Sequence, residues 1–390
     1  MKSGWVIKKL GELGTIVRGK GIRRNETVDR GLPCIRYGEI YTSYNYILDC
    51  PHSFVSKDVF ARCPKIKEGD VVFTLTGENK DEIAKALAYL GKDEIAAGGD
   101  LAIWSKHGCD PKFLAYMMYA PKLIEAKARA SNGDIIVHAS VKKMQEIDIP
   151  LPPLSEQKRI VAKIDAAFEK IDKLKANAER NLKNAKELFQ SALDEAMRPK
   201  PGWVEKRLGE VGPVCMCKRI LKSETNESGG VPFYKIGTFG KTPNAYISEE
   251  TYRRYRELYK FPRKGEILIS AAGTIGRTVV YDGEPAYFQD SNIVWIANDE
   301  TKVSNAYLQW YYKTSPWCVT KGATIPRLYN DNITSAAIAI PPIAEQRQIV
   351  KRLDFLAEKV KVLEQHYTRL IADCAEMRQS VLREAFEGRL

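Results

Sequence analysis

The longest regular pattern of apolar positions lies near the end of the chain, within residues 341–390. Apolar side chains recur there with alternating steps of four and three residues, which is the heptad pattern of helices that pack as a coiled coil. Two prolines precede the run, and proline suits the start of a helix but not its interior. The pattern predicts one long helix of about 37 residues, or about 55 Å. The apolar positions are Ile349, Leu353, Leu356, Val360, Leu363, Tyr367, Leu370, Cys374, Met377 and Val381.

The same element occurs a second time, earlier in the chain. PLPPLSEQKRIVAKID begins at Pro150 and IPPIAEQRQIVKRLD begins at Ile340, and the match runs without a gap from 152–197 onto 341–386. Many heptad positions of the first copy are small where those of the second copy are large. We therefore expect the two helices to pack against each other as antiparallel partners. The alternative is that each helix packs on its own domain.

The segments between the helices also repeat. GWVIKKLGEL at Gly4 returns as GWVEKRLGEV at Gly202, and KEGDVVFTL at Lys67 returns as RKGEILISA at Arg263, each a turn into an apolar strand. FLAYMMY at Phe113 corresponds to YLQWYYK at Tyr307, and both predict an amphipathic helix. The framework segments align, whereas the stretches between them differ in length and sequence.

These repeats predict a mixed α/β fold with two similar domains, two long helices that form an antiparallel coiled coil, and an approximate two-fold axis. The expected boundaries are a first domain at 1–151, a first long helix at 152–198, a second domain at 199–340 and a second long helix at 341–390.

Charge favours a polyanionic partner. The chain of 390 residues has a formal net charge of +12 and a pI of about 9.1, which suits DNA, RNA or an acidic lipid surface equally well. No stretch approaches the ~20 apolar residues that span a bilayer, and no secretory signal is apparent, so we expect a cytoplasmic protein. The eight cysteines include no CxxC pair and are expected to be free thiols; Cys215 and Cys217 are a weak metal signal.

A resemblance to a known family rests on three sets of repeated segments. These are the two junction motifs, the entry motifs at Gly4 and Gly202, and the strand pairs. Over essentially its whole length the chain resembles the specificity subunit of type I restriction–modification enzymes. The resemblance implies two target recognition domains that each read one half of a split double-stranded DNA sequence, with the helices setting the spacer between the halves. It also implies a subunit without catalysis or a cofactor of its own. Two methyltransferase subunits and restriction (translocase) subunits would join it and would bring S-adenosylmethionine, ATP and magnesium.

Basic and amide side chains on variable loops are the candidates for DNA contact. Base readout in the major groove uses Arg or Lys for guanine and Asn or Gln for adenine, while phosphates accept from any basic group. In the first domain the glycine-rich loop RGKGIRRNE and the segment IRYGEI supply Arg18, Lys20, Arg23, Arg24, Asn25, Arg36 and Tyr37. In the second domain the candidates are Lys218, Arg219, Lys222, Lys235, Lys241, Arg277, Lys321 and Arg327. For each residue an ordinary solvated side chain is the alternative, so the hypothesis rests on the loops as sets.

Two other functions remain open from the residues. Asp70, Glu78 and Lys80 around one strand have a spacing reminiscent of metal-dependent nucleases, which would make the chain a stand-alone DNA nuclease. The second domain does not repeat this spacing. The chain could also be a coiled-coil tether in another phage-defence complex, with basic domains that bind RNA or proteins. Neither the adenine-binding motif of a methyltransferase nor a phosphate-binding loop with its lysine is found.

Overall fold

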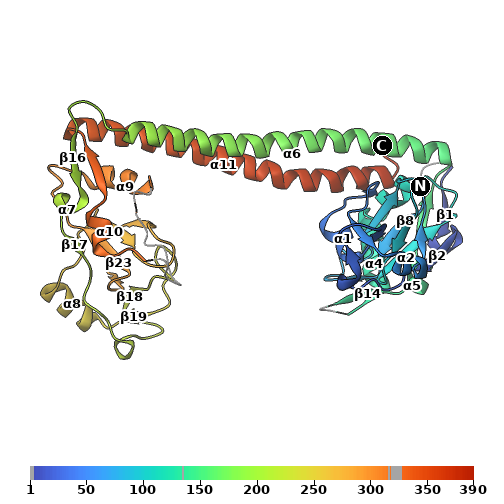
Figure 1. Cartoon of the computed structure of the whole chain (residues 1–390), viewed down its shortest axis with the longest axis horizontal. Coiled ribbons are helices and arrows are strands. Elements are labelled where there is room, and N and C mark those ends of the chain that lie inside the picture. The colour runs from blue at the N-terminus through green and yellow to red at the C-terminus, as the bar shows by residue number, and fades with distance from the viewer. Residues whose placement is uncertain (1–3, 134–135, 315–316, 318–326) are drawn as a thin grey trace. The chain divides into compact units, whose positions relative to one another are not determined.

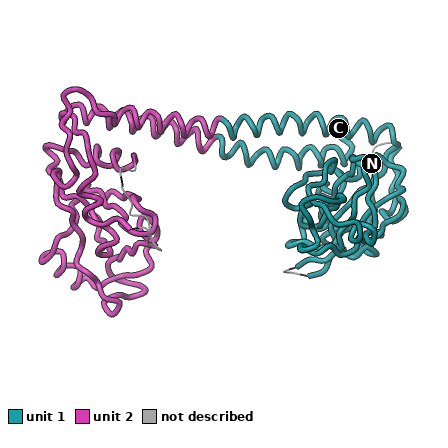
Figure 2. Tube along the Cα trace, in the orientation of Figure 1, with its two compact units in different colours: residues 1–180, 367–390 teal, residues 181–366 magenta. Residues whose placement is uncertain are grey.

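The computed structural model describes residues 4–133, 136–314, 317 and 327–390 (Figure 1). The chain divides into two compact units (Figure 2). The first unit is Met1–Arg180 together with Tyr367–Leu390, and the second is Asn181–His366. Both units combine strands and helices and both contain parts of the two long helices, so the predicted mixed α/β class is confirmed. Within the described ranges, no helix is both long and apolar enough to cross a membrane.

The sheets of the first unit have buried apolar strands at their centre. All four residues of β8 (Val71–Thr74) and of β10 (Ala86–Tyr89) are buried, as expected for strands of a sheet that is covered on both faces. The strand orders are β2-β12-β8-β10-β5, β3-β6-β4-β11-β7, β13-β14-β9 and β1-β15. The remaining strands are β1 (Val6–Lys9), β2 (Thr15–Arg18), β3 (Thr27–Val28), β4 (Leu32–Ile35), β5 (Ile47–Leu48), β6 (Ser53–Val55), β7 (Lys65–Ile66), β9 (Thr76–Gly77), β11 (Ile95–Ala97), β12 (Leu101–Ser105), β13 (Ser131–Asn132), β14 (Val137–Ala139) and β15 (Asp148–Leu151). The short helices are η1 (Leu10–Glu12), η2 (Arg24–Glu26), α1 (Tyr37–Thr42), α2 (Lys57–Arg62), α3 (Pro111–Met117), α4 (Pro121–Ala130) and α5 (Val141–Gln145).

The second unit repeats this plan, with fewer strands among its described residues. Its sheets have the orders β17-β23-β20-β21, β19-β18-β22 and β16-β24. The strands are β16 (Val204–Arg207), β17 (Val214–Cys215), β18 (Val231–Tyr234), β19 (Tyr246–Ile247), β20 (Ile267–Ser270), β21 (Thr278–Val280), β22 (Tyr287–Phe288), β23 (Ile293–Ile296) and β24 (Ala337–Ile340). The helices are α7 (Leu208–Val211), η3 (Lys222–Glu224), α8 (Glu249–Leu258), α9 (Asn305–Lys313) and α10 (Asn330–Thr334). The parallel pair β18–β22 corresponds to the parallel pair β4–β11 of the first unit, so the duplication seen in the sequence is also a duplication of topology.

The two long helices are α6 (Leu154–Met197) and α11 (Ile343–Phe386), with 44 residues each. At 1.5 Å per residue each is about 66 Å long, which exceeds the expected 55 Å. The carboxyl-terminal turns of each helix pack into a domain core: Leu193 and Ala196 in the second unit, Leu382 and Ala385 in the first. Burial of these side chains stabilises turns that would fray in an isolated helix.

Within the first unit the beginning of α6 runs antiparallel to the end of α11. Arg378 of α11 forms an ion pair with Asp172 of α6 and lies over the ring of Phe168 at 4.5 Å. Closer to the start of α6, Arg159 donates to the carbonyl oxygen of Leu390, which follows α11, at 2.7 Å. The helices therefore pack on each other and on the domain at once, so the two packing arrangements considered from the sequence are not exclusive.

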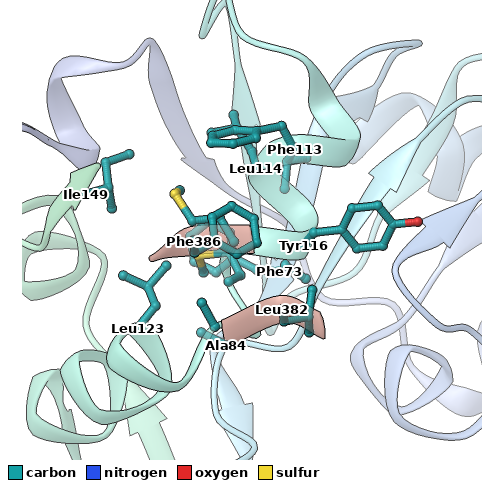
Figure 3. Packing of buried hydrophobic residues seen from close by; sticks show 14 of the residues in the cluster. Phe73, Ala84, Phe113, Leu114, Tyr116, Leu123, Ile149, Leu382 and Phe386 are labelled. Atoms are coloured by element: carbon teal, nitrogen blue, oxygen red, sulfur yellow. The ribbon is translucent and has the colours of Figure 1, made fainter. Parts of the chain in front are cut away.

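The core of the first unit includes the carboxyl end of α11. Leu382 and Phe386 lie among side chains of the domain, including Phe113 of α3 and Leu123 of α4 (Figure 3). The rings of Phe113 and Phe386 are 5.3 Å apart. Full burial of an apolar side chain of this size contributes roughly 2 kcal/mol. The end of the chain thus helps to hold together the domain at its beginning.

The repeated junction motif has a structural explanation in a buried glutamine. The side chain of Gln157 donates from Nε2 to the carbonyl oxygen of Pro152 at 2.9 Å. Its Oε1 accepts from the backbone N–H of Asp110 at 2.9 Å, and Asp110 is the N-cap residue of α3. One side chain therefore joins the start of α6 to the strand before it and to the start of α3.

Gln346 makes the same connection in the second unit. It is fully buried, donates to the carbonyl oxygens of Pro341 and Lys302 at 2.9 and 2.8 Å, and accepts from the N–H of Ser304 at 2.9 Å. Ser304 is the N-cap residue of α9. An apolar residue here would leave these backbone groups without partners, which explains why the chain carries glutamine at both junctions.

Candidate nucleic-acid interface

A hollow in the first domain collects several of the predicted DNA-contacting residues. It has a volume of about 720 Å³ and lies between the loop after β2, the junction of β4 with α1 and the turn after β11. Of the predicted residues, Arg24, Arg36 and Tyr37 line it. The other lining residues are Gly21, Ile22, Gly38, Glu39, Thr42, Gly98, Gly99 and Asp100.

Arg36 is the most constrained cation of this first-domain hollow. Its backbone N–H donates to Oε2 of Glu39 at 2.7 Å, and its Nη2 lies 3.8 Å from Oε1 of the same carboxylate. The Nε–H of Arg36 is buried and finds no acceptor among the residues that the structure describes. The side chain as a whole is 28% exposed, and an oriented, partly exposed guanidinium is suited to bind an acceptor from outside the chain.

The remaining first-domain residues lie on the exposed loop beside the hollow. Arg18 is held by the turn after β11, because its Nε donates to the carbonyl of Gly99 at 3.2 Å and its Nη2 lies 3.3 Å from Asp100. The other predicted residues of this loop are exposed: Lys20, Arg23 and Asn25. They are placed to contact a ligand larger than the hollow, such as a nucleic-acid backbone.

A second-domain hollow collects four predicted residues. Its volume is about 480 Å³, and Arg219, Lys222, Lys235 and Arg327 line it. The other lining residues are Ile220, Thr225, Phe233, Gln289, Asp290, Ser291 and Asn292.

Polar contacts fix the orientation of several of these side chains. The Nε of Arg219 lies 2.9 Å from Asp290, and Nη2 of Arg327 donates to Oδ1 of Asn292 at 3.4 Å. The Oε1 of Gln289 accepts from the N–H of Ile236 at 2.9 Å, so its amide nitrogen is the group that can donate to a ligand in the hollow. This hollow therefore presents arginine, lysine and amide groups together.

The two hollows occupy equivalent places. In the first domain Ala97 of β11 pairs with Ile35 of β4, one residue before Arg36. In the second domain Phe288 of β22 pairs with Tyr234 of β18, one residue before Lys235. The same framework therefore presents different side chains at the same site in the two domains.

Two predicted residues belong to a neighbouring hollow of the second domain, which has a volume of about 220 Å³. Lys241 and Arg277 line it, and the guanidinium of Arg277 donates to the carbonyl of Phe239 at 3.0 Å. Gly273 and Gly276 have φ of +67° and +77°, so this loop uses a backbone conformation that favours glycine. Lys218 lies over the ring of Tyr259 at 5.0 Å and is not among the lining residues of these hollows, and Lys321 lies outside the described residues.

Sequence reasoning missed the polar residues supplied by the turns after β11 and β22. These are Asp100 in the first domain and Gln289, Asp290, Ser291 and Asn292 in the second. A signal for them exists in the sequence. AAGGDLAIW and YFQDSNIVW have the same length and end on the buried residues Trp104 and Trp295, yet they differ at the polar positions between.

Asp70, one residue of the nuclease alternative, has a structural role in a turn. Asp70 is buried and accepts from the N–H of Lys67 at 2.8 Å, and burial raises the pKa of its carboxyl group. Glu266 makes the equivalent bond to the N–H of Arg263 at 2.7 Å, and its pKa is likewise raised by burial. Both carboxylates close the tight turn before a central strand. Over the part of the chain that the structure describes, no group of three or more His, Cys, Asp or Glu could hold a metal ion.

Comparison with known proteins gives a consistent match. The family model described as the type I restriction modification DNA specificity domain matches residues 2–184 and again residues 200–370. A putative type I restriction enzyme specificity subunit of Haemophilus influenzae is 52% identical over 217 residues, which is 54% of this chain and 56% of that protein. The EcoKI specificity subunit of Escherichia coli is 24% identical over 428 residues, covering 100% of this chain and 90% of that protein.

Solved structures share the fold. A chain from work on the assembly and conformational transition of the type I R-M system matches with a TM-score of 0.77 and 23% identity, covering 100% of this chain and 99% of that one. The HsdS subunit from Thermoanaerobacter tengcongensis matches with a TM-score of 0.64 and 22% identity, covering 100% and 98%.

Proposed function

The chain belongs to the family of type I restriction modification DNA specificity domains, and we propose that its two hollows each read one half of a split DNA target. The specificity subunit of a type I restriction–modification system is a DNA-recognition subunit rather than an enzyme. The nuclease alternative is not favoured, because Asp70 has the same role in a turn as Glu266 of the second domain.

The equivalent placement of the two basic hollows is the observation that carries this proposal. Arginine can donate two parallel hydrogen bonds to O6 and N7 of guanine, and an Asn or Gln amide can pair with adenine. The first-domain hollow offers Arg24 and Arg36, whereas the second offers Arg219 and Arg327 beside Asn292. Because the linings differ, we expect the two half-sites to have different sequences.

The predicted partners follow from the same proposal. Two methyltransferase subunits and the restriction (translocase) subunits would supply S-adenosylmethionine, ATP and magnesium. This chain would determine which DNA sequence the complex binds. The long helices offer a charged outer surface for these partners, since many of their lysines and glutamates are exposed. Examples on α6 are Lys173, Glu179, Lys186 and Glu187.

The first experiment is single-molecule sequencing of methylated adenines in genomic DNA with the gene intact and deleted. A split motif that disappears on deletion is the expected result, and it gives both half-sites and the spacer. Binding of the purified chain to a duplex with that motif should exceed binding to random duplex and weaken steeply with salt. Equal binding to random duplex, or preference for RNA, would contradict the proposal and favour a tether.

A single substitution tests the assignment of the first-domain hollow. Arg36→Ala should weaken binding to the motif by about 5- to 150-fold, from the loss of one guanidinium–base contact of about 1–3 kcal/mol, and should relax specificity in one half-site only. Arg129→Ala is the matched control, because Arg129 is an exposed arginine on α4 of the same unit. Unchanged specificity with Arg36→Ala would show that this hollow does not read bases.

A further inference from the structure

A separate cavity lies in the first unit beneath the end of α11, away from the hollow that contains Arg36. We call it the Trp5 cavity, and its volume is about 570 Å³. This volume is in the range of sites that hold small ligands or peptide side chains. Its lining includes Trp5, Met117, Leu123, Asp148, Pro150 and Phe386, together with charged side chains of α4 and of residues 383–389.

The second unit shows how the equivalent place is filled. There Tyr311 and Tyr307 of α9 reach β24, and their hydroxyl groups donate to the carbonyl oxygens of Ala337 and Ala339, each at 2.7 Å. Tyr311 is buried. A phenol ring and its hydroxyl therefore close the gap between helix and strand in this copy.

The first unit lacks these phenol groups. Phe113 and Met117 of α3 stand where α9 has Tyr307 and Tyr311, as the repeated segments FLAYMMY and YLQWYYK show. Neither side chain has a hydroxyl, and methionine has no ring, and the Trp5 cavity lies beside Met117.

The strand beside the cavity has the same register in both copies. Asp148 of β15 pairs with Lys9 of β1, as Ala337 of β24 pairs with Arg207 of β16. Asp148 therefore presents the backbone carbonyl that corresponds to the one bound by Tyr311.

A second difference between the copies concerns a tryptophan. Trp203 donates from Nε1 to a carboxylate oxygen of Glu345 at 3.1 Å. Trp5 is its counterpart in the first unit and is only 9% exposed, yet its Nε1–H has no acceptor among the residues described. An unpaired buried donor is unfavourable, so a ligand that supplies an acceptor would be stabilised by it.

We propose that the Trp5 cavity receives a tyrosine side chain presented by a segment of a partner protein. The ring packs on Met117, Leu123 and Phe386, and the hydroxyl donates to the carbonyl of Asp148, as Tyr311 donates to Ala337 within the chain. A backbone carbonyl of the partner segment accepts from Trp5. The cavity is larger than one side chain, which leaves room for the flanking backbone.

The test uses the full chain with ¹³C-methyl methionine and N-acetyl-L-tyrosinamide as the probe. The methyl resonance of Met117 should shift saturably, while that of Met216 in the second unit should not. N-acetyl-L-phenylalaninamide lacks the hydroxyl and should bind about fivefold more weakly, as expected for one hydrogen bond. No shift of Met117, equal affinity for both probes, or shifts at every methionine would overturn the proposal.

Free L-tyrosine is the second arm of the titration. A cavity that serves a protein segment should prefer the amide, whose ends resemble a peptide, over the charged amino acid. Tighter binding of the free amino acid would instead identify a site for tyrosine itself and would overturn the assignment to a partner protein.

A filling variant supplies the final comparison. Met117→Tyr places the ring and hydroxyl of the second unit into the cavity and should reduce probe binding by at least about tenfold. Tyr311→Phe is the matched control, since it alters the corresponding residue of the other unit and should leave probe binding unchanged. Undiminished probe binding to a folded Met117→Tyr chain would overturn the proposal.

Discussion

Two buried glutamines show how single residues connect the long helices to the rest of each unit. Gln157 and Gln346 each bond the proline carbonyl at the start of a long helix and the N-cap backbone of a short one. The glutamine therefore fixes the angle at which the long helix leaves the domain. The repeat of EQ in the two junction motifs reflects this shared requirement.

Replacement of Gln346 by alanine should destabilise the chain by about 3 kcal/mol, because one N–H and two carbonyl groups lose their partner inside a buried site. The measurement is the free energy of unfolding in urea. Gln348→Ala is the control, since Gln348 is exposed on the same helix and its loss should cost less than about 0.5 kcal/mol. Equal effects of the two substitutions would show that the buried contacts contribute little.

Lys127 is buried, and its Nζ donates to the carbonyl oxygen of Ala84 at 3.2 Å. Burial lowers its pKa from 10.5 to about 7. At pH values between about 7 and 10.5, Lys127 is protonated in the unfolded chain and neutral in the folded chain. Stability therefore rises with pH across this window, and the cost of the buried ammonium is fully present below about pH 7.

Lys127→Met should therefore stabilise the chain near neutral pH, and its advantage should shrink by on the order of 2 kcal/mol between about pH 7.5 and 9.5. The measurement is the difference in free energy of unfolding between variant and original chain at each pH, which cancels the titration of other groups. Lys122→Met, at an exposed position of the same helix, should show no such slope. A pH-independent advantage for Lys127→Met would mean that Lys127 remains charged in the folded chain.

At the scale of elements, α11 belongs to the cores of both units. Its beginning packs in the second unit through Ile349 and Leu353, and its end packs in the first unit through Leu382 and Phe386. A helix that ends in a domain far away in the sequence makes that domain depend on the end of the chain.

Leu382→Ala should destabilise the first unit by about 3 kcal/mol, because Leu382 is fully buried and its loss leaves a cavity. Hydrogen exchange should accelerate in α3 of the first unit and remain slow in β20 of the second. Leu188→Ala is the matched control, since Leu188 on α6 is 70% exposed. Uniform acceleration in both units would show instead that they unfold together.

The heptad pattern predicted the long helices but not everything they touch. Cys374 and Leu353 are buried as the pattern requires, whereas Leu363 and Met377 occupy heptad positions and remain exposed. A pair of helices without further cover buries only part of its apolar seam. The heptad pattern could not predict that Phe386 packs against Phe113, because periodicity does not specify contacts between distant segments.

The binding loops were predictable only as loops. The basic residues after β2 and β17 stood out by charge, and Arg24 and Arg219 do line the hollows. Gln289 and Asn292 did not stand out, because an amide is ordinary in any loop until the parallel pairing of β18 with β22 brings it beside Lys235. Sequence gives the candidates, and the sheet topology selects among them.

At the scale of the whole molecule, duplication supplies two similar frameworks on which different chemistry has developed. The two hollows share their position but not their side chains, and the first unit has the Trp5 cavity beside Met117, where the second has Tyr311. Both long helices are continuous over 44 residues. If the hollows read two half-sites, we therefore expect the length of these helices to set the length of the spacer that the chain prefers.

Removal of one heptad from each helix, residues 177–183 and 367–373, should therefore shorten the preferred spacer. These segments are matched, since Asp172 pairs with Arg378 just outside them. Seven residues are about 10.5 Å of helix, or about 3 base pairs, and a whole heptad keeps the apolar seam in register to within about 20°. The measurement is selection of bound duplexes from a library that holds the split motif and varies its spacer. Alanine replacement of the exposed residues in the same segments keeps the length and should keep the spacer. If the shortened chain selects the original spacer, the helices do not set the distance between the half-sites.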